Sequence, residues 1–217
     1  MTGSADAAPF PTPTIVPLGD SAMLVRFGTT LTDVANQAAI ALTGMLDRAP
    51  LEGVLEVVPN LVSVMLRYDP QATRFGDIAS QLRLRLLAQA NGPAEAGRGW
   101  TIPITFDGPD LAAIAERLGM TVADFIEAHN AAPLRVLATG FAPGFVYCGL
   151  HAEALVVPRR TEVRPMVAPG TVLFAAGQTA ITATELPTGW HMIGHTDFAN
   201  FDATNTPPTR LQPGDTI

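Results

Sequence analysis

Residues 165–181 read PMVAPGTVLFAAGQTAI, and this stretch sets the pattern for the second half of the chain. Each apolar run in it is only a few residues long and stops at Gly or Pro. The same spacing continues on both sides, from Leu134 to Gly194. Short apolar runs punctuated in this way are typical of many short strands joined by tight turns, as in a β-barrel. The pattern therefore predicts a β-barrel domain over residues 98–217.

The first half of the chain has longer periodic runs that alternate between strand and helix patterns. Apolar positions at helical spacing between Leu31 and Arg48 indicate a helix, for example. The full predicted order is strand, strand, helix, strand, strand, helix, at Thr14–Pro17, Ala22–Phe27, Leu31–Arg48, Val54–Val58, Leu61–Tyr68 and Phe75–Ala90. This order fits an antiparallel sheet with both helices on one face. We predict an α+β protein with a disordered tail at residues 1–13 and an N-terminal domain at residues 14–92.

The segment that opens the second half combines a strand pattern with two helix patterns. A strand is expected at Trp100–Phe106, followed by short helices at Asp110–Leu118 and Val122–Asn130. Thr121 and Asp124 have the spacing of a capping box, which marks the start of the second of these helices. That helix carries acidic residues and no arginine, so it is unsuited to reading DNA.

Charge composition excludes several mechanisms. The 217 residues include 13 basic side chains, and every one of them is arginine. Without lysine the chain has no P-loop lysine, no Schiff-base lysine and no attachment point for biotin. The net charge of -7 argues against a nucleic-acid partner. Neither a membrane-spanning apolar run nor a signal-peptide pattern is present, and the expected location is the cytoplasm.

Two segments stand out as candidate ligand sites. Residues 140–147 read GFAPGFVY, which is either a turn with aromatic anchors or a loop that offers backbone N–H groups and an aromatic wall to a ligand. Arg159, Arg160 and Arg164 form the dense basic cluster of an acidic chain. The cluster is either an anion site, since guanidinium groups bind carboxylate or phosphate bidentately, or a solvated turn paired with nearby glutamates.

Histidine and cysteine spacing indicates no metal site. His191 and His195 fall within a predicted strand, where residues four apart are roughly 13 Å from each other, too far to share one ion. Either could act as a general acid or base. His129 and His151 are expected to be surface or capping residues. Cys148, the single cysteine, is expected to be a small buried side chain.

These motifs, taken in order, resemble a known family. The matching segments are Gly140–Tyr147, Pro158–Arg160, Gly177–Thr179, Gly189–Trp190, Ile193–Thr196 and Leu211–Asp215, together with Gly19–Ala22 and Val58–Asp69. They are similar to the family of the B component of prokaryotic ATP-dependent 5-oxoprolinase, also described as allophanate hydrolase subunit 1 or the KipI type. They also resemble one half of the carboxyltransferase domain of urea carboxylase. The resemblance implies an N-terminal ferredoxin-like α/β sandwich and a C-terminal cyclophilin-like β-barrel.

The resemblance further implies a function that this chain does not perform alone. It would be the B component of a complex with a larger, C-type barrel subunit and a lactam-utilisation subunit, hydrolysing a lactam or amide such as 5-oxoproline with ATP and Mg. Two family alternatives remain: an inhibitor that binds a sensor histidine kinase, and an allophanate hydrolase or urea carboxylase component. The residues carried over from the family are Arg159 and Arg160, expected to be catalytic, and Phe141, Pro143, Gly144, Tyr147, Arg164, Gln178, Thr179 and Trp190, expected to bind substrate. His195, which stands where the family usually has Arg, is added as a catalytic candidate because an imidazole can act as a general acid or base.

Overall fold

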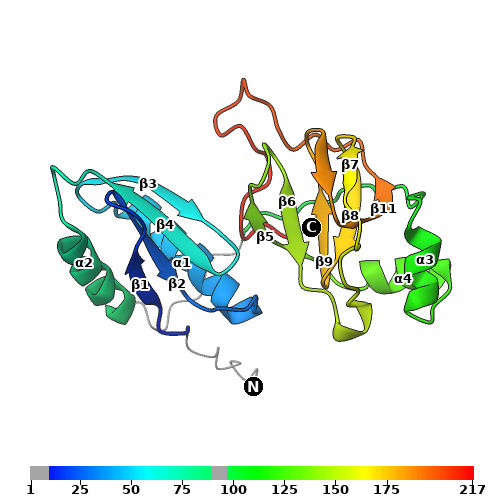
Figure 1. Cartoon of the computed structure of the whole chain (residues 1–217), viewed down its shortest axis with the longest axis horizontal. Coiled ribbons are helices and arrows are strands. Elements are labelled where there is room, and N and C mark those ends of the chain that lie inside the picture. Colours follow the sequence, from blue (N-terminus) through cyan, green and yellow to red (C-terminus); the bar gives the residue numbers. More distant parts are fainter. Residues whose placement is uncertain (1–9, 89–96) are drawn as a thin grey trace, which may run out of the picture. The chain divides into compact units, whose positions relative to one another are not determined.

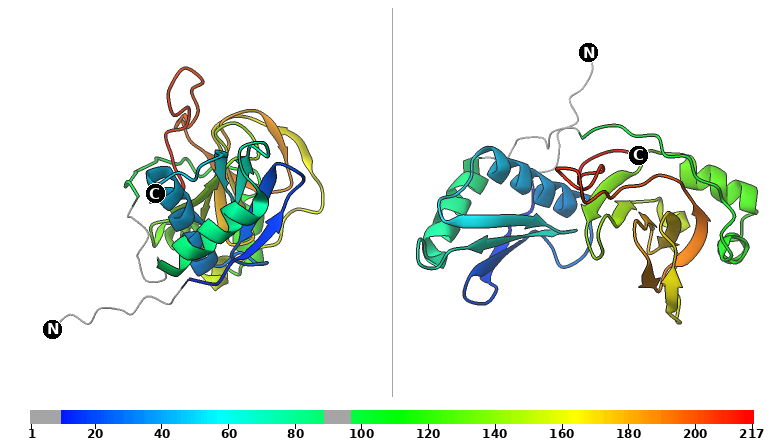
Figure 2. Two further views of the ribbon diagram at one scale, coloured as in Figure 1. Left: turned by 90° about the vertical axis from the view of Figure 1, so that its left-hand side faces the viewer. Right: turned by 90° about the horizontal axis from the view of Figure 1, so that it is seen from above.

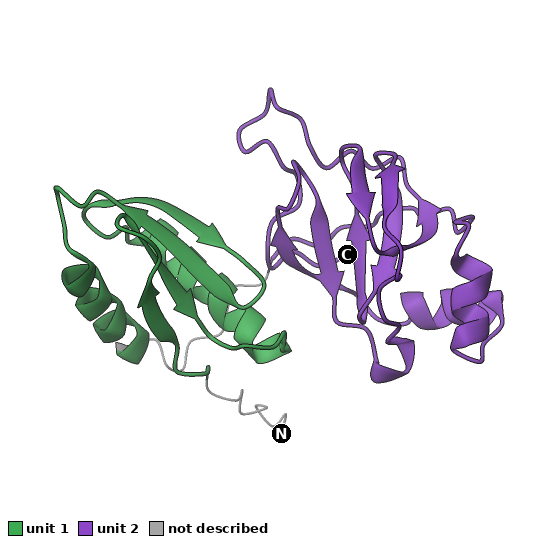
Figure 3. Cartoon of the chain, viewed as in Figure 1, with its two compact units in different colours: residues 1–96 green, residues 97–217 purple. Residues whose placement is uncertain are grey.

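The computed structural model describes residues 10–88 and 97–217, which belong to two compact units (Figure 3). Unit 1 covers residues 1–96 and unit 2 covers residues 97–217. Both units combine helices with antiparallel sheets, which confirms the α+β class. Most of the predicted tail and the boundary predicted at residue 92 lie outside the described residues.

Unit 1 has the predicted element order within residues 10–88. Its elements are β1 (Thr14–Pro17), β2 (Ala22–Arg26), α1 (Asp33–Arg48), β3 (Val54–Pro59), β4 (Ser63–Tyr68) and α2 (Phe75–Ala88). The strands form one antiparallel sheet in the order β1-β2-β4-β3 (Figure 1). Helix α1 therefore connects β2 to β3 across the intervening β4, a split β-α-β arrangement. The side chain of Thr32 caps α1 by accepting a hydrogen bond from the backbone N–H of Ala35.

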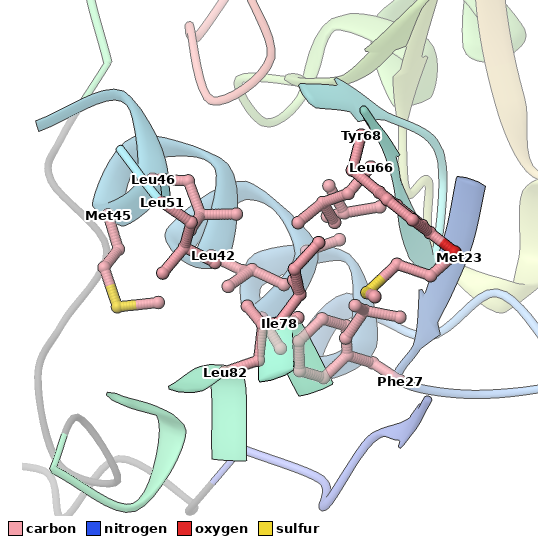
Figure 4. Close-up of a cluster of buried hydrophobic side chains, with 14 of the residues drawn as sticks. Met23, Phe27, Leu42, Met45, Leu46, Leu51, Leu66, Tyr68, Ile78 and Leu82 are labelled. Atoms are coloured by element: carbon pink, nitrogen blue, oxygen red, sulfur yellow. The ribbon is translucent and has the colours of Figure 1, made fainter. Parts of the chain in front are cut away.

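The core of unit 1 lies between the sheet and both helices (Figure 4). Met23 and Leu66 come from the two central strands. They meet Leu42 from α1 and Ile78 and Leu82 from α2, and all five side chains are fully buried. Because both helices contribute to one cluster, both cover the same face of the sheet, as the sequence predicts.

Unit 2 is built mainly from short antiparallel strands. Its elements are α3 (Leu111–Arg117), α4 (Val122–Asn130), β5 (Arg135–Thr139), β6 (Val146–Gly149), the 3-10 turn η1 (Glu153–Leu155), β7 (Arg164–Val167), β8 (Thr171–Ala175), β9 (Gln178–Ile181), β10 (Leu186–Thr188) and β11 (His191–His195). Five strands form a sheet in the order β11-β8-β9-β6-β5, and β10 pairs with β7. Helix α3 packs against β11, and the predicted capping box of α4 forms between Thr121 and Asp124.

The strand predicted at Trp100–Phe106 is wrong. Within this segment only Thr105 forms an isolated bridge, to His195, and Gly99, just before it, forms another to Thr216. Pro103 lies between these bridges and has no N–H to donate, so a continuous ladder cannot form. The segment nevertheless runs along the edges of unit 2 and contributes apolar side chains to its core.

Two buried polar side chains hold distant segments of unit 2 together. Asp215 accepts hydrogen bonds from the backbone N–H of Arg98, the indole N–H of Trp100 and the backbone N–H of Gln212. Asn200 donates to the carbonyl of Gly144 and accepts from the N–H of Leu211. The segment between, residues 201–209, projects from the sheet as the red-orange loop of Figures 1 and 2, and its ends are paired by an isolated bridge.

Candidate functional site

The strand register of unit 2 determines which predicted site residues face one another. Tyr147 on β6 pairs with Ala180 on β9, and Gly149 pairs with Gln178. Partners across an antiparallel pair share a face, and successive residues alternate between faces. Tyr147 and Gln178 therefore lie on one face of the sheet, which we call the tyrosine face. Cys148 and Thr179 pair with each other and lie on the opposite face, the threonine face.

Aromatic rings line the tyrosine face. The ring centroids lie 5.6 Å apart for Phe141 and Phe145, 4.8 Å for Phe145 and Tyr147, and 5.9 Å for Tyr147 and Trp190. Phe145 and Trp190 are buried, whereas Phe141 is 73% exposed and holds a φ of 74°. A left-handed backbone is a genuine outlier for a bulky residue. The loop thus presents one ring to solvent at a conformational cost.

Gly144 sets the shape of the same loop. Its φ of 68° suits glycine, and an added Cβ would lie 2.5 Å from the Cβ of Phe201 and 2.8 Å from the Cβ of Ala183. Only a residue without a side chain fits here. Pro143, the other loop residue predicted to bind substrate, is exposed beside it.

Arg159 adds a positive charge to the tyrosine face. Its guanidinium carbon lies 5.6 Å from the ring centroid of Trp190, a cation–π contact. Burial raises the pKa of the Tyr147 phenol, and the charge of Arg159 lowers it in part. Arg159 forms no ion pair with any carboxylate among the described residues. This guanidinium is therefore available to an anionic group.

The other two arginines of the cluster make a different contact. Oδ1 of Asp110 accepts hydrogen bonds from Arg160 at 2.9 Å and from Arg164 at 2.6 Å, and Oδ2 accepts from the backbone N–H of Met192 at 2.8 Å. The carboxylate joins the segments before α3, β7 and β11. The three predicted arginines therefore separate into one that is unpaired and two that share a partner within unit 2.

Gln178 has an unsatisfied side-chain oxygen. It is only 7% exposed, and its Oε1 is buried without a hydrogen-bond partner. On the tyrosine face it is the diagonal neighbour of Tyr147 across the β6–β9 pair. A buried orphan acceptor costs roughly 1–3 kcal/mol. The oxygen is enclosed within unit 2, and its missing hydrogen bond lowers the stability of the unit.

His195 lies apart from the aromatic residues. It is exposed at the far end of β11 from Trp190, and its Nδ1 lies 2.9 Å from Oδ1 of Asp107. His191 instead contacts the carbonyl of Pro158 with its Nε2 atom, at 3.0 Å. The structure thus brings together Phe141, Tyr147, Arg159 and Trp190, and it does not bring His195 to them.

The expectation that His129 and His151 are surface or capping residues is wrong. His129 is 3% exposed, and the two imidazole rings lie 4.7 Å apart. The Nε2 atoms of both lie 2.8 Å from Oγ1 of Thr179. Phe125 precedes His129 by four residues on α4 and is also fully buried, so the helical spacing of these two residues was the signal that could have placed the imidazole inside.

Ionisation on the threonine face is governed by burial. Desolvation lowers the pKa of His129, and desolvation together with the charge of His129 lowers that of His151 to about 4. Burial raises the pKa of Cys148 to about 12, so the thiol is the small apolar group that the sequence predicts. Within residues 10–88 and 97–217, no group of three or more His, Cys, Asp or Glu side chains is arranged to hold a metal ion.

Comparison with known proteins places the chain in a family. The model of the carboxyltransferase domain, subdomain C and D, matches residues 13–211. The B component of 5-oxoprolinase from Bacillus subtilis (strain 168) is 31% identical over 213 residues, covering 92% of this chain and 89% of the relative. The chain belongs to the carboxyltransferase subdomain C and D family, and within it to the group that includes the B component of 5-oxoprolinase.

Solved structures agree with this assignment. The crystal structure of TTHA0988 is 34% identical with a TM-score of 0.78, over 90% of this chain; the chain spans only 38% of the length of TTHA0988. Urea amidolyase of K. lactis shares the fold at 16% identity, with a TM-score of 0.74 over 95% of this chain and 14% of its own. No helix in the described part of the chain combines the length and apolar character needed to cross a bilayer.

Proposed function

We propose that the chain is the B component of a cytoplasmic, ATP-dependent 5-oxoprolinase-like complex that hydrolyses a lactam or a related amide, and that it is inactive alone. One observation carries the proposal. The match to the B component of a 5-oxoprolinase extends over 92% of this chain and 89% of that relative. The relative's name implies further subunits, and we assign the same dependence to this chain. Its partners would be a larger barrel subunit and a lactam-utilisation subunit.

The tyrosine face is the part of this chain that suits such a substrate. A lactam with a carboxylate, such as 5-oxoproline, offers one anionic group and one amide N–H. Arg159 is free to contact the anion, and Oε1 of Gln178 is a buried acceptor without a donor. Trp190 and Tyr147 supply the apolar surface beside them. In this assignment Arg160 and Arg164 support the site through Asp110 and do not contact substrate.

The residues of this chain do not suit ATP with its metal ion. The chain has no lysine for a P-loop, and the described residues include no group of three or more His, Cys, Asp or Glu side chains arranged to hold a metal ion. The tyrosine face fits one anionic group. We therefore assign nucleotide and metal to the partner subunits, where ATP would supply phosphoryl activation of a poorly electrophilic amide carbonyl. The contribution of this chain would be to bind and orient the substrate.

We also propose the finer fold assignments, a ferredoxin-like unit 1 and a cyclophilin-like barrel for unit 2. The split β-α-β arrangement supports the first, and the short antiparallel strands support the second.

The test is reconstitution. The chain is co-expressed with the large barrel subunit and the lactam-utilisation subunit encoded beside it, and 5-oxoproline-dependent ATP hydrolysis is measured with and without this chain. We expect turnover only with all subunits present. In the assembled complex Arg159→Gln should raise the KM for 5-oxoproline about tenfold or more, since it removes one charge-assisted hydrogen bond. Arg159→Lys should retain part of the affinity.

Three outcomes would contradict the proposal. Absence of lactam-dependent turnover in a fully assembled complex would exclude the lactam hydrolase. Binding of the isolated chain to the dimerisation helices of a sensor histidine kinase, with inhibition of autophosphorylation, would instead favour the inhibitor role. Turnover of allophanate or urea by the same complex would point to the third family activity.

A further inference from the structure

A chain of hydrogen bonds on the threonine face joins three segments of unit 2. Oγ1 of Thr179, on β9, lies 2.8 Å from Nε2 of His129, on α4, and 2.8 Å from Nε2 of His151, which follows β6. Nδ1 of His129 lies 2.9 Å from Oδ1 of Asn130. The proposed function does not use this cluster, because Thr179 and Tyr147 point from opposite faces of the sheet. It is therefore a second polar centre within unit 2.

His151 belongs to a largely irregular segment, residues 150–157, which we call the flap. It is the yellow-green loop that follows β6 in Figure 1. Two of its side chains, Leu155 and Val157, are buried in one cluster with Phe174. Phe174 pairs with Thr179, so the flap lies over the threonine face. His151 is half-buried, and the other side chains of the flap are exposed, namely Leu150, Ala152, Glu153, Ala154 and Val156.

Few polar contacts hold the flap to the sheet beneath it. The backbone N–H of His151 donates to the carbonyl of Gly177, and the N–H of Ala176 donates to the carbonyl of Val157. The imidazole of His151 adds the contact with Thr179. A segment with few buried side chains and few hydrogen bonds to its surroundings can open at a lower free-energy cost than the sheet that it covers.

One hydroxyl serves both imidazoles, which limits the protons that the closed cluster can hold. With both rings neutral, one Nε2 atom donates to Oγ1 of Thr179 and the other accepts its hydroxyl proton. We assign Nδ1–H of His129 as the donor to Asn130, which makes Nε2 of His129 the acceptor. A proton added to His151 then leaves the chain of hydrogen bonds intact but creates a partly buried charge. A second proton, on His129, would turn both Nε2 atoms into donors and leave the hydroxyl proton without an acceptor.

No acidic side chain compensates a charge on these rings. Their centroids lie 4.7 Å apart, and neither ring forms an ion pair with a carboxylate among the described residues. Strand β6 contributes the thiol of Cys148, which burial keeps protonated, and β8 and β9 contribute no charged side chain. The charged side chains of α3, of α4 and of the flap itself are all exposed, namely Glu116, Arg117, Asp124, Glu127 and Glu153. Protonation is therefore unfavourable while the flap is closed.

We propose that the flap is an acid-sensitive element, which opens in mild acid while the sheet beneath it stays folded. Opening exposes the imidazoles to water, where a histidine titrates near pH 6.5. The open state then binds more protons than the closed state, so a falling pH shifts the equilibrium toward it. The pKa of His151 in the closed state is about 4. For this residue alone, the ratio of open to closed molecules should rise about thirtyfold between pH 7.5 and pH 5. The inference is independent of the lactam hydrolase, because it involves the opposite face of the sheet.

Hydrogen–deuterium exchange of the full chain, read by mass spectrometry of peptides, measures the opening at pH values from 7.5 to 5. Each rate is divided by that of the urea-unfolded chain at the same pH, which removes the intrinsic pH dependence of exchange. We expect the flap to be less protected than β8 at every pH, and its protection to fall about thirtyfold between pH 7.5 and pH 5. Low concentrations of urea should change the protection of β8 more than that of the flap, since local opening exposes little surface.

Two outcomes in the wild type would overturn the proposal. Equal protection of the flap and of β8 would mean that the flap opens only when unit 2 unfolds, and flap protection that does not change with pH would exclude the imidazoles as the cause. Variants then identify the group responsible. His151→Gln should remove most of the pH dependence, and the exposed His195→Gln should keep it. Leu155→Ala should lower the protection of the flap at every pH and leave the thirtyfold change in place, because it removes apolar packing without removing a titrating group.

Discussion

Gln178 and Thr179 are adjacent on β9, and their side chains leave the sheet on opposite faces. Gln178 lies on the same face as Tyr147, and Thr179 lies between the buried imidazole of His129 and the half-buried imidazole of His151. The two residues therefore belong to different sites. A substitution at one should leave the chemistry of the other intact, which allows the two faces to be examined separately.

Replacing Gln178 by Met should have opposite effects on stability and on function. The change removes a buried oxygen that has no partner, so the free energy of unfolding should rise by about 1 kcal/mol. If the oxygen receives the substrate's N–H, turnover of the assembled complex should fall. Thr179→Val is the contrasting variant and should lower stability, because both imidazoles lose their shared hydroxyl. Urea unfolding of both variants provides the comparison; a destabilised Gln178→Met would show that the amide already has its partners.

Asp110 should contribute strongly to the stability of unit 2. Asp110→Asn removes the charge that two arginines share, and we expect a loss of about 2 kcal/mol in the free energy of unfolding. Asp107→Asn is the control, because its contact with His195 is exposed and should be worth less than about 1 kcal/mol. Equal losses in the two variants, measured by urea titration, would rule out the role given to Asp110.

The paired histidines should make the chain less stable in mild acid. In the unfolded chain a histidine titrates near 6.5, and in the fold the pKa of His151 is lowered to about 4 by burial and by the charge of His129. The unfolded state therefore binds more protons between these values. The contribution of His151 to the free energy of unfolding is therefore fully present well above pH 6.5. It decreases as the pH falls toward 4, and about 2 kcal/mol is lost at pH 5.

Chemical unfolding at a series of pH values from 7.5 to 5 measures this decline. His151→Gln should flatten it, and the exposed His195→Gln should retain it. If the free energy of unfolding of His151→Gln fell with decreasing pH as steeply as that of the wild type, groups other than His151 would be responsible.

Gly144 should tolerate no side chain. Gly119 has nearly the same φ, 70°, but no atom within 4 Å of an added Cβ. Gly119→Ala should therefore report the backbone strain alone, about 1 kcal/mol. Gly144→Ala should cost about 1–3 kcal/mol more, because its Cβ would clash with Phe201 and Ala183. Thermal unfolding of the pair gives the difference, and similar losses for both would mean that the loop moves to make room.

The phenol of Tyr147 should report the charge of Arg159. Because that guanidinium lowers the pKa of the phenol in part, Arg159→Gln should move the pKa further upward. Ultraviolet titration in a Tyr68→Phe background isolates the signal, since the chain has only two tyrosines. A downward shift would contradict the placement of Arg159 beside the ring.

The sequence predicts the secondary-structure elements better than it predicts the contacts between residues that are far apart in the chain. The order of unit 1 and the capping box at Thr121 depend on residues close together in the chain, and both are confirmed. The strand predicted at Trp100–Phe106 fails because β-pattern residues do not reveal that Pro103 interrupts pairing with a distant partner. The positions of Gln178 and Thr179 on opposite faces follow from alternation along β9. The neighbours of these two side chains depend on the register of β9 with β6 and β8, and on helix α4, which carries His129.

The hydrogen bonds of Asp215 have a topological consequence. They join residues at the start of unit 2, Arg98 and Trp100, to the turn at Gln212, and Gly99 pairs with Thr216. The polypeptide of unit 2 thus returns to its own starting point, so its path approximates a ring. A ring of this kind can be opened elsewhere without changing which segments touch. The projecting loop at residues 201–209 is the natural place, and cleavage of the backbone there should leave the same sheet and the same core held together by these contacts.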